Sequence, residues 1–393
     1  MNWASPRKWS LPVNVVQFNL CRLWPFRSKR LWVFGAREGT KFDDNSRYMF
    51  EYMIREHRDE FRCVWMTNDS SVVKNLQAKG FEAELNSSLK GKWFQLRAGV
   101  ALYSHGLIDF GMFPLVGGSF CVALWHGMGF KKIYNGKYTG KSLKAKKLLD
   151  HVFSWTYRDL TPVTSEFARS WVKEMFTLKD DGIKITGQPR NDAFRNVNKD
   201  EILSEIDIPA DKRVIIFMPT YRQPQLGDNA MFKVVECLYM SKSLDKYLLV
   251  SNSVMVVKLH PLTPHIDLPQ RENFMILDYQ AVEDNQQLMA IADVLVTDYS
   301  SCFVDYGLLE RPIIFYTPDE EVFIEHSEKM EPDYFKLAAL CKAQTPDELV
   351  SKLEHPNMEI VKRTNEIFED ESIKGTCYSE NVYNAICKEI ELK

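Results

Sequence analysis

The sequence lacks the features that mark several common classes of protein. None of its eight cysteines belongs to a Cys-x-x-Cys pair or lies near a histidine at metal-ligand spacing, which argues against a zinc site. No apolar run of about 18 residues occurs, and no apolar stretch ends in a cleavage site for export, so we expect no membrane-spanning segment. The net charge of −3 argues against a nucleic-acid-binding protein with a generally basic surface. These absences indicate a protein with reduced thiols whose chemistry faces the cytoplasm.

The usual signals of metal-dependent phosphate chemistry are also missing. The sequence contains no glycine-rich Walker loop and no paired carboxylates at metal-ligand spacing. We therefore expect any bound phosphate to be held by side-chain cations and backbone N–H groups, without an obligatory metal or other cofactor.

Acidic residues are absent from residues 1–30, which combine cations with aromatic rings. The cations are Arg7, Lys8, Arg22, Arg27, Lys29 and Arg30, and the rings belong to Trp3, Trp9, Phe18, Trp24 and Phe26. This mixture suits binding to an anionic membrane surface. The alternative is a flexible basic tail packed loosely on the body, because Pro6, Pro12 and Pro25 should break any long helix.

A second basic stretch favours the membrane interpretation. It carries Lys131, Lys132, Lys137, Lys141, Lys144, Lys146 and Lys147 with few acidic residues among them. A solvated helix face would have the same composition, so this stretch does not decide the question alone.

Short apolar runs alternate with amphipathic stretches along the rest of the chain, which predicts parallel strands joined by helices. A first set of strands is expected at 30–36, 61–69, 100–106 and 120–127, with a helix that has Asn45 or Ser46 as its N-cap. A second set is expected at 213–222, 253–261, 274–279, 292–301 and 312–318. A chain of 393 residues usually forms more than one core. We predict two α/β domains, 31–187 and 188–393, that face a cleft and meet near Gly187.

His126 lies at the carboxyl end of the apolar run FCVALWHG, where open α/β sheets place their ligands. Gly127 and Gly129 leave the following loop free of bulky side chains. A histidine titrates near neutral pH and can take a proton from an attacking hydroxyl group. A histidine whose ring is satisfied by backbone at a strand end is an equally good interpretation of this position.

Potential cations follow two strands of the second set. Lys258 and His260 are two residues apart in VVKLHP, so in an extended strand they share a face and suit a phosphate or pyrophosphate. Thr220 and Arg222 end another predicted strand, where the guanidinium could hold a phosphate through two parallel hydrogen bonds. The alternative for Lys258 and His260 is a solvated sheet edge.

A third strand end carries the turn TDYSS before an amphipathic helix. Asp298, Ser300 and Ser301 lie where a helix N-terminus offers free N–H groups, which makes the turn a candidate anion site. The same residues also serve as ordinary helix caps, and both uses can coexist. Because the carboxyl ends of parallel strands meet at one sheet edge, we expect these features to converge with Arg222, Lys258 and His260.

An ordered set of sequence blocks resembles the CDP-glycerol glycerophosphotransferase family, which includes teichoic-acid primases and polymerases and their capsule-polymer relatives. The blocks are FGAREGTKFDDNSRYMFEY, LWHGMGFKKI, ITGQPRNDAF, IIFMPTYR, VVKLHP and ADVLVTDYSSCFVDYGLLERPIIFY, running from about residue 34 to 316. The resemblance implies two Rossmann-like domains in a glycosyltransferase-B-like fold, with the acceptor in the first and the nucleotide donor in the second.

The resemblance also implies roles for individual residues. His126 and His260 match the two catalytic histidines of the family, and Ser300 and Ser301 match its diphosphate-binding turn. Arg222 matches the arginine of its PTYR block, with Thr220, Lys258 and Asp298 as further donor-binding candidates. Asn45, Lys131, Arg190 and Asn191 lie in matching blocks with less defined roles. Two departures concern Met128–Gly129, where the family often has Thr-Pro, and the stretch after 318, which lacks a glycine-rich arginine segment.

The function implied is transfer of glycerol phosphate, or a related alditol phosphate, from CDP-glycerol to a hydroxyl of a lipid-linked cell-surface glycan precursor, releasing CMP. The enzyme would then be a peripheral protein on the cytoplasmic face of the cell membrane. One alternative is a glycosyltransferase of the same fold that uses a nucleotide sugar. Another is a non-catalytic membrane-bound assembly subunit, against which the presence of both His126 and His260 argues.

Overall fold

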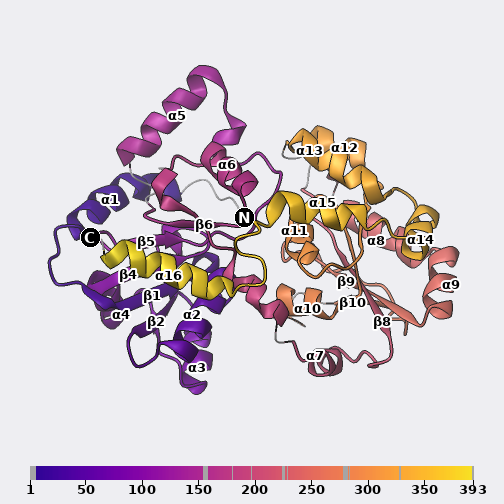
Figure 1. Cartoon of the computed structure of the whole chain (residues 1–393), viewed down its shortest axis with the longest axis horizontal. Helices are drawn as coiled ribbons and strands as arrows, with labels where there is room; N and C mark the ends of the chain where they lie inside the picture. The colour runs from indigo at the N-terminus through magenta and orange to yellow at the C-terminus, as the bar shows by residue number, and fades with distance from the viewer. Residues whose placement is uncertain are drawn as a thin grey trace. The chain divides into compact units, whose positions relative to one another are not determined.

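The computed structural model describes residues 6–153, 158–178, 180–195, 197–223, 226–227, 229–277, 282, 284–326 and 329–391. The chain forms two compact units (Figure 1). The first comprises residues 1–126, 134–192 and 370–393, and the second comprises 127–133 and 193–369. Residues 370–393 thus pack with the first unit, whereas the sequence division assigned them to the second.

The first unit contains a parallel five-stranded sheet in the order β3-β2-β1-β4-β5. Its strands are β1 (Ser28–Gly35), β2 (Arg62–Thr67), β3 (Ala83–Leu85), β4 (Ala98–Tyr103) and β5 (Phe120–Ala123), and β6 (Thr161–Val163) and β7 (Ile183–Ile185) form a separate parallel pair. Its helices are α1 (Pro6–Cys21), α2 (Asp44–Glu56), α3 (Ser70–Ala78), α4 (Leu89–Arg97), α5 (Gly140–Phe153), α6 (Glu166–Met175) and α16 (Tyr378–Glu391).

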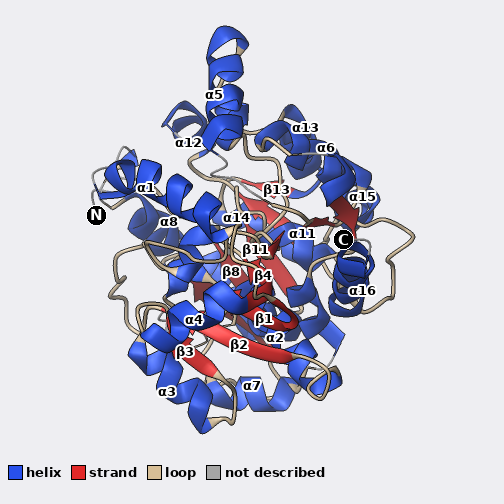
Figure 2. Cartoon of the chain, turned by 90° about the vertical axis from the view of Figure 1, so that its left-hand side faces the viewer, coloured by secondary structure: helices blue, strands red, loops and turns tan. Residues whose placement is uncertain are grey.

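Helices cover both faces of this sheet because its strands are apolar on both faces (Figure 2). On one face, Trp32 and Phe34 pack in a core that includes residues of α2 and α16. On the other face, Leu31 and Val33 pack in a core that includes Phe18 of α1 and Phe94 of α4. The alternation of successive side chains between two cores is the pattern expected for a strand covered on both sides.

The N-terminal segment is folded against the first unit. Helix α1 runs through Pro12, contrary to the expectation that the prolines would break it, and its Phe18 and Cys21 side chains are buried. Burial of one helix face against the core can outweigh the hydrogen bond lost at one proline. Trp3 and the side chains of Arg7, Lys8 and Trp9 lie outside the described part of the chain. Among the described residues, no helix combines the length and apolar composition needed to cross a membrane.

The C-terminal helix α16 completes the first unit. Its Val382 and Ile386 are buried beside α2, and Asp192 accepts hydrogen bonds at 2.8 Å from the backbone N–H groups of Tyr378 and Ser379 at the helix start. Gly187 has φ +79°, and a Cβ at this position would overlap the Tyr378 ring. The predicted boundary glycine therefore allows the chain to pass close to the returning helix.

The second unit contains a parallel six-stranded sheet in the order β10-β9-β8-β11-β12-β13. Its strands are β8 (Arg213–Met218), β9 (Ser253–Lys258), β10 (Phe274–Leu277), β11 (Val294–Thr297), β12 (Ile313–Tyr316) and β13 (Lys342–Ala343). Its helices are α7 (Lys199–Glu205), α8 (Ala230–Tyr239), α9 (Lys242–Val250), α10 (Asn285–Ile291), α11 (Cys302–Gly307), α12 (Glu320–His326), α13 (Pro332–Ala338), α14 (Pro346–Glu354) and α15 (Glu359–Phe368). Each strand predicted from the sequence overlaps one of these strands or one of the first unit.

Candidate functional site

His126 follows β5 in the first unit and is exposed. Its Nδ1 lies 3.3 Å from the Ser104 carbonyl oxygen at the end of the neighbouring strand β4. A carbonyl oxygen only accepts hydrogen bonds, so Nδ1 carries the proton in the neutral ring and Nε2 is the basic atom. This tautomer is the one that a general base needs.

A second histidine, which the sequence reasoning did not single out, lies against His126. The His105 ring is stacked on it, with centroids 4.4 Å apart and an angle of 11° between the planes. The backbone N–H of Arg37 donates to His105 Nδ1 at 3.3 Å, and the Trp125 ring lies 4.0 Å from the His126 ring. His126 therefore contacts two aromatic neighbours.

The start of α2 fixes the backbone around His126. Asn45, which is buried, donates from Nδ2 to the Trp125 carbonyl at 2.9 Å and accepts from the Arg190 N–H at 3.0 Å. Arg190 Nη1 donates to the His126 carbonyl at 2.8 Å and pairs with Asp44 Oδ1 at 3.0 Å. Asn45 and Arg190 thus position the loop that carries His126.

Asp44 places a buried negative charge near the two histidines. Burial opposes its ionisation, but Arg190 and Arg37, helped by the histidines, outweigh that effect and hold its pKa well below the usual range. Its Oδ2 atom has no hydrogen-bond partner among the described residues. Asp44 has φ +63°, a strained backbone conformation that is common at functional positions.

Both histidines are neutral at physiological pH. Although His126 is exposed, the protein atoms crowded around it desolvate the ring and lower its pKa to about 4, against the opposing charge of Asp44. Burial, reinforced by His126, lowers the pKa of His105 to about 3. A neutral His126 with Nε2 available can accept a proton, and Asp44 favours the protonated ring once it forms.

Asp109 organises the turn that carries His105. Its carboxylate accepts hydrogen bonds from the backbone N–H groups of Glu38, Ser104 and His105 at 2.7–3.0 Å. Burial raises the pKa of Asp109 to about 7 despite these donors. The turn is therefore fixed by a buried side chain on the short helix that follows it.

Arg222 of the second unit is buried in a cluster of fixed charges. Its Nη1 lies 2.7 Å from Asp298 Oδ2, and its Nε and Nη2 lie 2.7 and 3.0 Å from the two oxygens of Asp319. Nη1 also donates to the Thr220 carbonyl at 2.8 Å. These bonds use four of the five guanidinium N–H groups. The prediction that Arg222 binds a phosphate through two parallel hydrogen bonds is wrong for this geometry. The Nε and Nη2 groups that would form those bonds already donate to the two oxygens of Asp319.

Thr220, Asp298 and the following serines lie together at the ends of β8 and β11. Asp298 Oδ1 accepts from the Thr220 N–H at 2.8 Å, and Thr220 Oγ1 is buried without a hydrogen-bond partner among the described residues. Ser300 and Ser301 are partly exposed just before α11, and Ser300 Oγ accepts weakly from the Cys302 N–H at 3.4 Å. Asp298 therefore joins the β8 loop to the serine turn.

The loop that follows His126 belongs to the second unit and meets this turn. A Cβ added at Gly129 would lie 3.1 Å from Ser301 Cβ, so only a small residue fits there without a shift. Lys131 pairs with Met330 in an isolated antiparallel bridge, and the Phe130 ring lies 6.3 Å from that of Phe303 in α11. Lys131 therefore lies in the packed loop rather than on a free basic helix.

Lys258 and His260 are not presented together as the sequence predicted. Strand β9 ends at Lys258, whose side chain is buried and whose Nζ donates to the Val282 carbonyl at 2.7 Å. His260 is exposed, its Nδ1 accepts from the Leu262 N–H at 3.2 Å, and its ring lies 5.7 Å from that of Tyr221. The shared-face argument fails because the extended strand does not reach His260.

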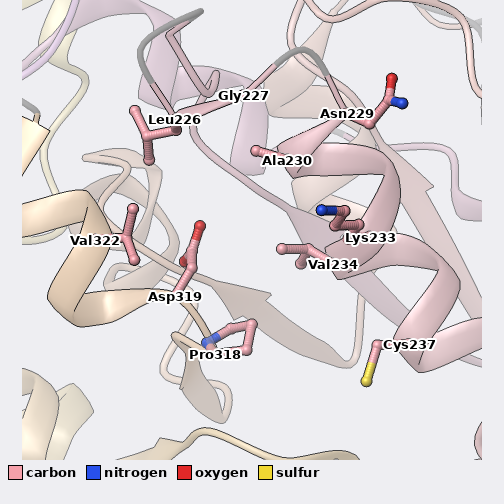
Figure 3. A pocket seen from close by; sticks show the side chains of 10 residues that line it. All are labelled: Leu226, Gly227, Asn229, Ala230, Lys233, Val234, Cys237, Pro318, Asp319 and Val322. Atoms are coloured by element: carbon pink, nitrogen blue, oxygen red, sulfur yellow. The ribbon is translucent and has the colours of Figure 1, made fainter.

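A cavity of about 450 Å³ adjoins the Arg222 cluster (Figure 3). Asp319 and Val322 line one side of it, while Ala230, Lys233 and Cys237 from α8 line the other. Asp319 thus lies both in the cavity wall and in the ion pair with Arg222.

Of the remaining candidates, Asn191 is buried in the first unit and its N–H donates to the Gln188 carbonyl at 3.0 Å.

A protein-family model described as CDP-Glycerol:Poly(glycerophosphate) glycerophosphotransferase matches residues 16–388, nearly the whole chain. The chain belongs to this family. It is accordingly a transferase, and it is similar to the teichoic acid poly(glycerol phosphate) polymerase of Bacillus spizizenii, at 26% identity over 93% of this chain and 92% of that protein. It is also similar to the teichoic acid glycerol-phosphate transferase of Staphylococcus aureus, at 26% identity over 79% of each chain.

Among solved structures, the wall teichoic acid polymerase TagF matches this member of the glycerophosphotransferase family with a TM-score of 0.76. The sequences are 22% identical, and the match covers 98% of this chain and 97% of that chain. This likeness confirms the glycosyltransferase-B-like α/β fold that the sequence resemblance implied. Among the described residues, no group of histidine, cysteine or acidic side chains could hold a metal ion.

Proposed function

We propose that this chain transfers glycerol phosphate from CDP-glycerol to a hydroxyl group of a lipid-linked precursor of a cell-surface glycan, with release of CMP. The observation that carries the proposal is the family match over residues 16–388, joined to the geometry of His126. The relatives named as glycerol-phosphate polymerase and transferase support an alditol phosphate as the transferred group. The product would be a teichoic-acid or capsule-type polymer or its first unit.

In this mechanism the acceptor oxygen attacks the phosphorus that bears glycerol, and its proton passes to His126 Nε2. The bond from that phosphorus to the bridging oxygen of the diphosphate breaks, and CMP leaves with the bonding electrons. Asp44 stabilises the imidazolium that forms, because its carboxylate charge raises the pKa of His126. Positioning and charge stabilisation supply most of the rate in phosphoryl transfer.

The donor diphosphate is proposed to bind at the turn of Ser300 and Ser301, beside exposed His260. In this role Arg222 acts indirectly, since it holds Asp298, which in turn holds the Thr220 backbone. The buried ammonium of Lys258 likewise acts indirectly in this proposal, since it donates to the Val282 carbonyl and does not bind a phosphate oxygen. His260 is therefore the side chain proposed to stabilise the negative charge of the leaving phosphate.

A lipid-linked acceptor requires the enzyme to work at a membrane, and we propose the cytoplasmic face of the cell membrane as its location. The basic and aromatic composition of the N-terminal segment supports this location. Helix α5, with exposed Lys141, Lys144 and Lys147, adds positive charge to the first unit.

The test is the identity of the released nucleotide. CDP-glycerol, related CDP-alditols and a panel of nucleotide sugars are incubated with the enzyme and a lipid-linked disaccharide acceptor. Release of CMP in step with a new phosphodiester in the product supports the proposal. Release of an intact nucleoside diphosphate from a nucleotide sugar, with CDP-glycerol inert, would show that the enzyme is a glycosyltransferase.

A further inference from the structure

The cavity beside Asp319 contains a thiol that the proposed reaction does not use. Cys237 of α8 is exposed and lines this cavity, as does Lys233 one turn earlier on the same face of the helix. Both lie across the cavity from Asp319 and Val322 (Figure 3). The volume of about 450 Å³ falls within the range of roughly 300–1,000 Å³ that is usual for small-molecule sites.

The other cysteines are less accessible to a reagent. Burial raises the pKa of the partly exposed Cys302 to about 11 and also raises the pKa of Cys387. The Cys377 sulfur lies 3.5 Å from a carboxylate oxygen of Asp192, whose negative charge opposes formation of a thiolate. Because the thiolate is the nucleophile, Cys237 should be the most reactive thiol of the protein. The remaining thiols are buried, namely those of Cys21, Cys63, Cys121 and Cys341.

A buried hydroxyl group lies next to this thiol. Tyr316 ends β12 and is fully buried, and its hydroxyl group has no hydrogen-bond partner among the described residues. Burial and the nearby Cys237 thiol raise the pKa of this hydroxyl group, so it keeps its proton at physiological pH. A buried donor without an acceptor costs free energy, and a negatively charged sulfur would accept from it. Tyr316 can therefore stabilise a thiolate at Cys237.

The described lining of the cavity indicates which kind of molecule it can hold. Both carboxylate oxygens of Asp319 already accept hydrogen bonds from Arg222. Lys233 is exposed and forms no ion pair within the described residues, so its ammonium group can meet a negative charge. The cavity thus suits a small molecule with an apolar body and an anionic group. The apolar part of the lining consists of Leu226, Ala230, Val234, Pro318 and Val322.

We propose that Cys237 is a site of reversible S-thiolation, where a small anionic disulfide enters the cavity and leaves one half of itself on the sulfur. The Cys237 thiolate attacks one sulfur of the disulfide, whose S–S bond breaks as the new S–S bond forms. The proton of the thiol passes to solvent, and the other half of the disulfide departs as a thiolate. The disulfide is the co-reactant, and an excess of free thiol reverses the reaction.

An adduct in the cavity would share its wall with Asp319. Asp319 pairs with Arg222, Arg222 pairs with Asp298, and Asp298 accepts from the Thr220 N–H beside the serine turn. We expect the adduct to disturb this series of contacts and so to weaken donor binding. That consequence rests on the proposed function, whereas modification of Cys237 does not.

Peptide mapping identifies the modified residue. The full-length, folded protein is incubated with dithiodipropionate, a dianionic disulfide, and its peptides are analysed by mass spectrometry over time. We expect the first adduct on Cys237 and its removal by excess dithiothreitol. Cys387→Ser is a control that should react like wild type, since the pKa of this partly buried thiol is raised. Equal rates of first adduct formation for wild type and Cys237→Ser would overturn the proposal.

A charge reversal tests the role of Lys233. Cystamine is a dicationic disulfide of similar size to dithiodipropionate. Lys233→Glu should slow modification by dithiodipropionate about fivefold or more at low ionic strength and accelerate modification by cystamine, and salt should reduce both effects. Lys246→Glu, at an exposed position of α9 in the same unit, is the matched control and should change neither rate. Unchanged rates for Lys233→Glu would show that the cavity does not select an anion.

A bulky residue in the cavity wall tests entry of the reagent. Val322 lines the cavity and is 47% exposed, while Ile324 on the same helix α12 is 49% exposed and lies outside the described lining. Val322→Trp should slow modification of Cys237 by about tenfold or more, because the indole group fills space that the reagent needs. Ile324→Trp is the matched control and should react like wild type. Equal rates for the two variants would show that the reagent reaches Cys237 without entering the cavity.

Calorimetry of CDP-glycerol binding tests the link to the donor site. We expect the adduct to weaken binding about tenfold and dithiothreitol to restore it. If the unmodified protein does not bind CDP-glycerol, the proposed function is wrong and the mapped site at Cys237 stands. If the modified and unmodified forms bind CDP-glycerol equally, the proposed link between Cys237 and the donor turn is wrong.

Discussion

The imidazole rings of His105 and His126 lie 4.4 Å apart and within 11° of parallel. Two elements bring them there, since His105 follows β4 and His126 follows the adjacent strand β5. The backbone holds each ring from a different side, through the Arg37 N–H on His105 and the Ser104 carbonyl on His126. Stacking of this kind restricts rotation of the ring that must take the proton.

Replacing His105 should therefore impair catalysis without preventing folding. We expect His105→Ala to lower kcat by about tenfold or more through loss of orientation of His126, with KM for CDP-glycerol little changed. His105→Phe should recover much of that loss, because a flat ring restores the stack. His57→Ala is a matched control, since the His57 ring is stacked on Tyr383 at 3.9 Å in the same unit. Equal kcat for His105→Ala and the control would show that His105 does not orient His126 for catalysis.

Loss of either proposed catalytic histidine should cost more. His126→Ala and His260→Ala should each lower kcat by about 10² or more, as removal of a base or of a charge stabiliser does. Both residues are exposed, so the thermal stability of each variant should remain near that of wild type. Near-normal turnover by a folded variant would show that the residue has no direct role.

The acid limb of the pH profile should report the environment of His126. The pKa of this ring is lowered from an ordinary value of 6.5 to about 4, so the basic form persists at pH 5 and is lost as the pH falls through about 4. We expect kcat/KM to rise with pH below about 4 and then to level off, as measured by CMP release across buffers of constant ionic strength. Asp44→Asn should move the limb to lower pH, because the carboxylate favours the protonated ring. A wild-type limb near 6.5 would contradict the desolvation of the ring.

Arg222 should prove to be a stability determinant. Arg222→Ala leaves buried Asp298 and partly buried Asp319 without their counter-ion, and we expect the free energy of unfolding to fall by about 3–5 kcal/mol. Chemical denaturation followed by circular dichroism measures this change. Arg222→Lys should recover little, since one ammonium group cannot replace donors that point to both carboxylates. A stable Arg222→Ala variant with weakened CDP-glycerol binding would restore the direct phosphate role.

Predictions from the sequence succeeded where the pattern was local. Parallel strands covered on both faces are continuous apolar runs, so their positions and their polar carboxyl ends could be identified directly. Family membership and the fold followed from the ordered blocks. Arg222 was misjudged because its partners Asp298 and Asp319 lie 76 and 97 positions away, and such pairing is not visible in a local motif.

Other features depend on which strands become neighbours. His105 ends the run VALYSHG, but only the pairing of β4 with β5 brings it against His126. Lys258 obeys the two-residue periodicity of a strand, yet β9 ends there and the chain turns before His260. The burial of one face of α1 could not be inferred, because three prolines suggested an irregular segment and its packing partners lie in β1, α4 and β5.

The return of the chain in α16 sets an order of events during synthesis. The ribosome must release nearly all of the polypeptide before Val382 and Ile386 can close the core over Trp32 and Phe34. The β-sheet of the first unit is translated early, but the side of its core that α16 covers stays exposed to solvent until the chain is nearly complete. Residues 193–369 of the second unit, in contrast, emerge as one uninterrupted stretch. The nascent first unit is therefore the part of this protein that most needs chaperone protection, and shortening the chain from its C-terminus should expose that flank permanently.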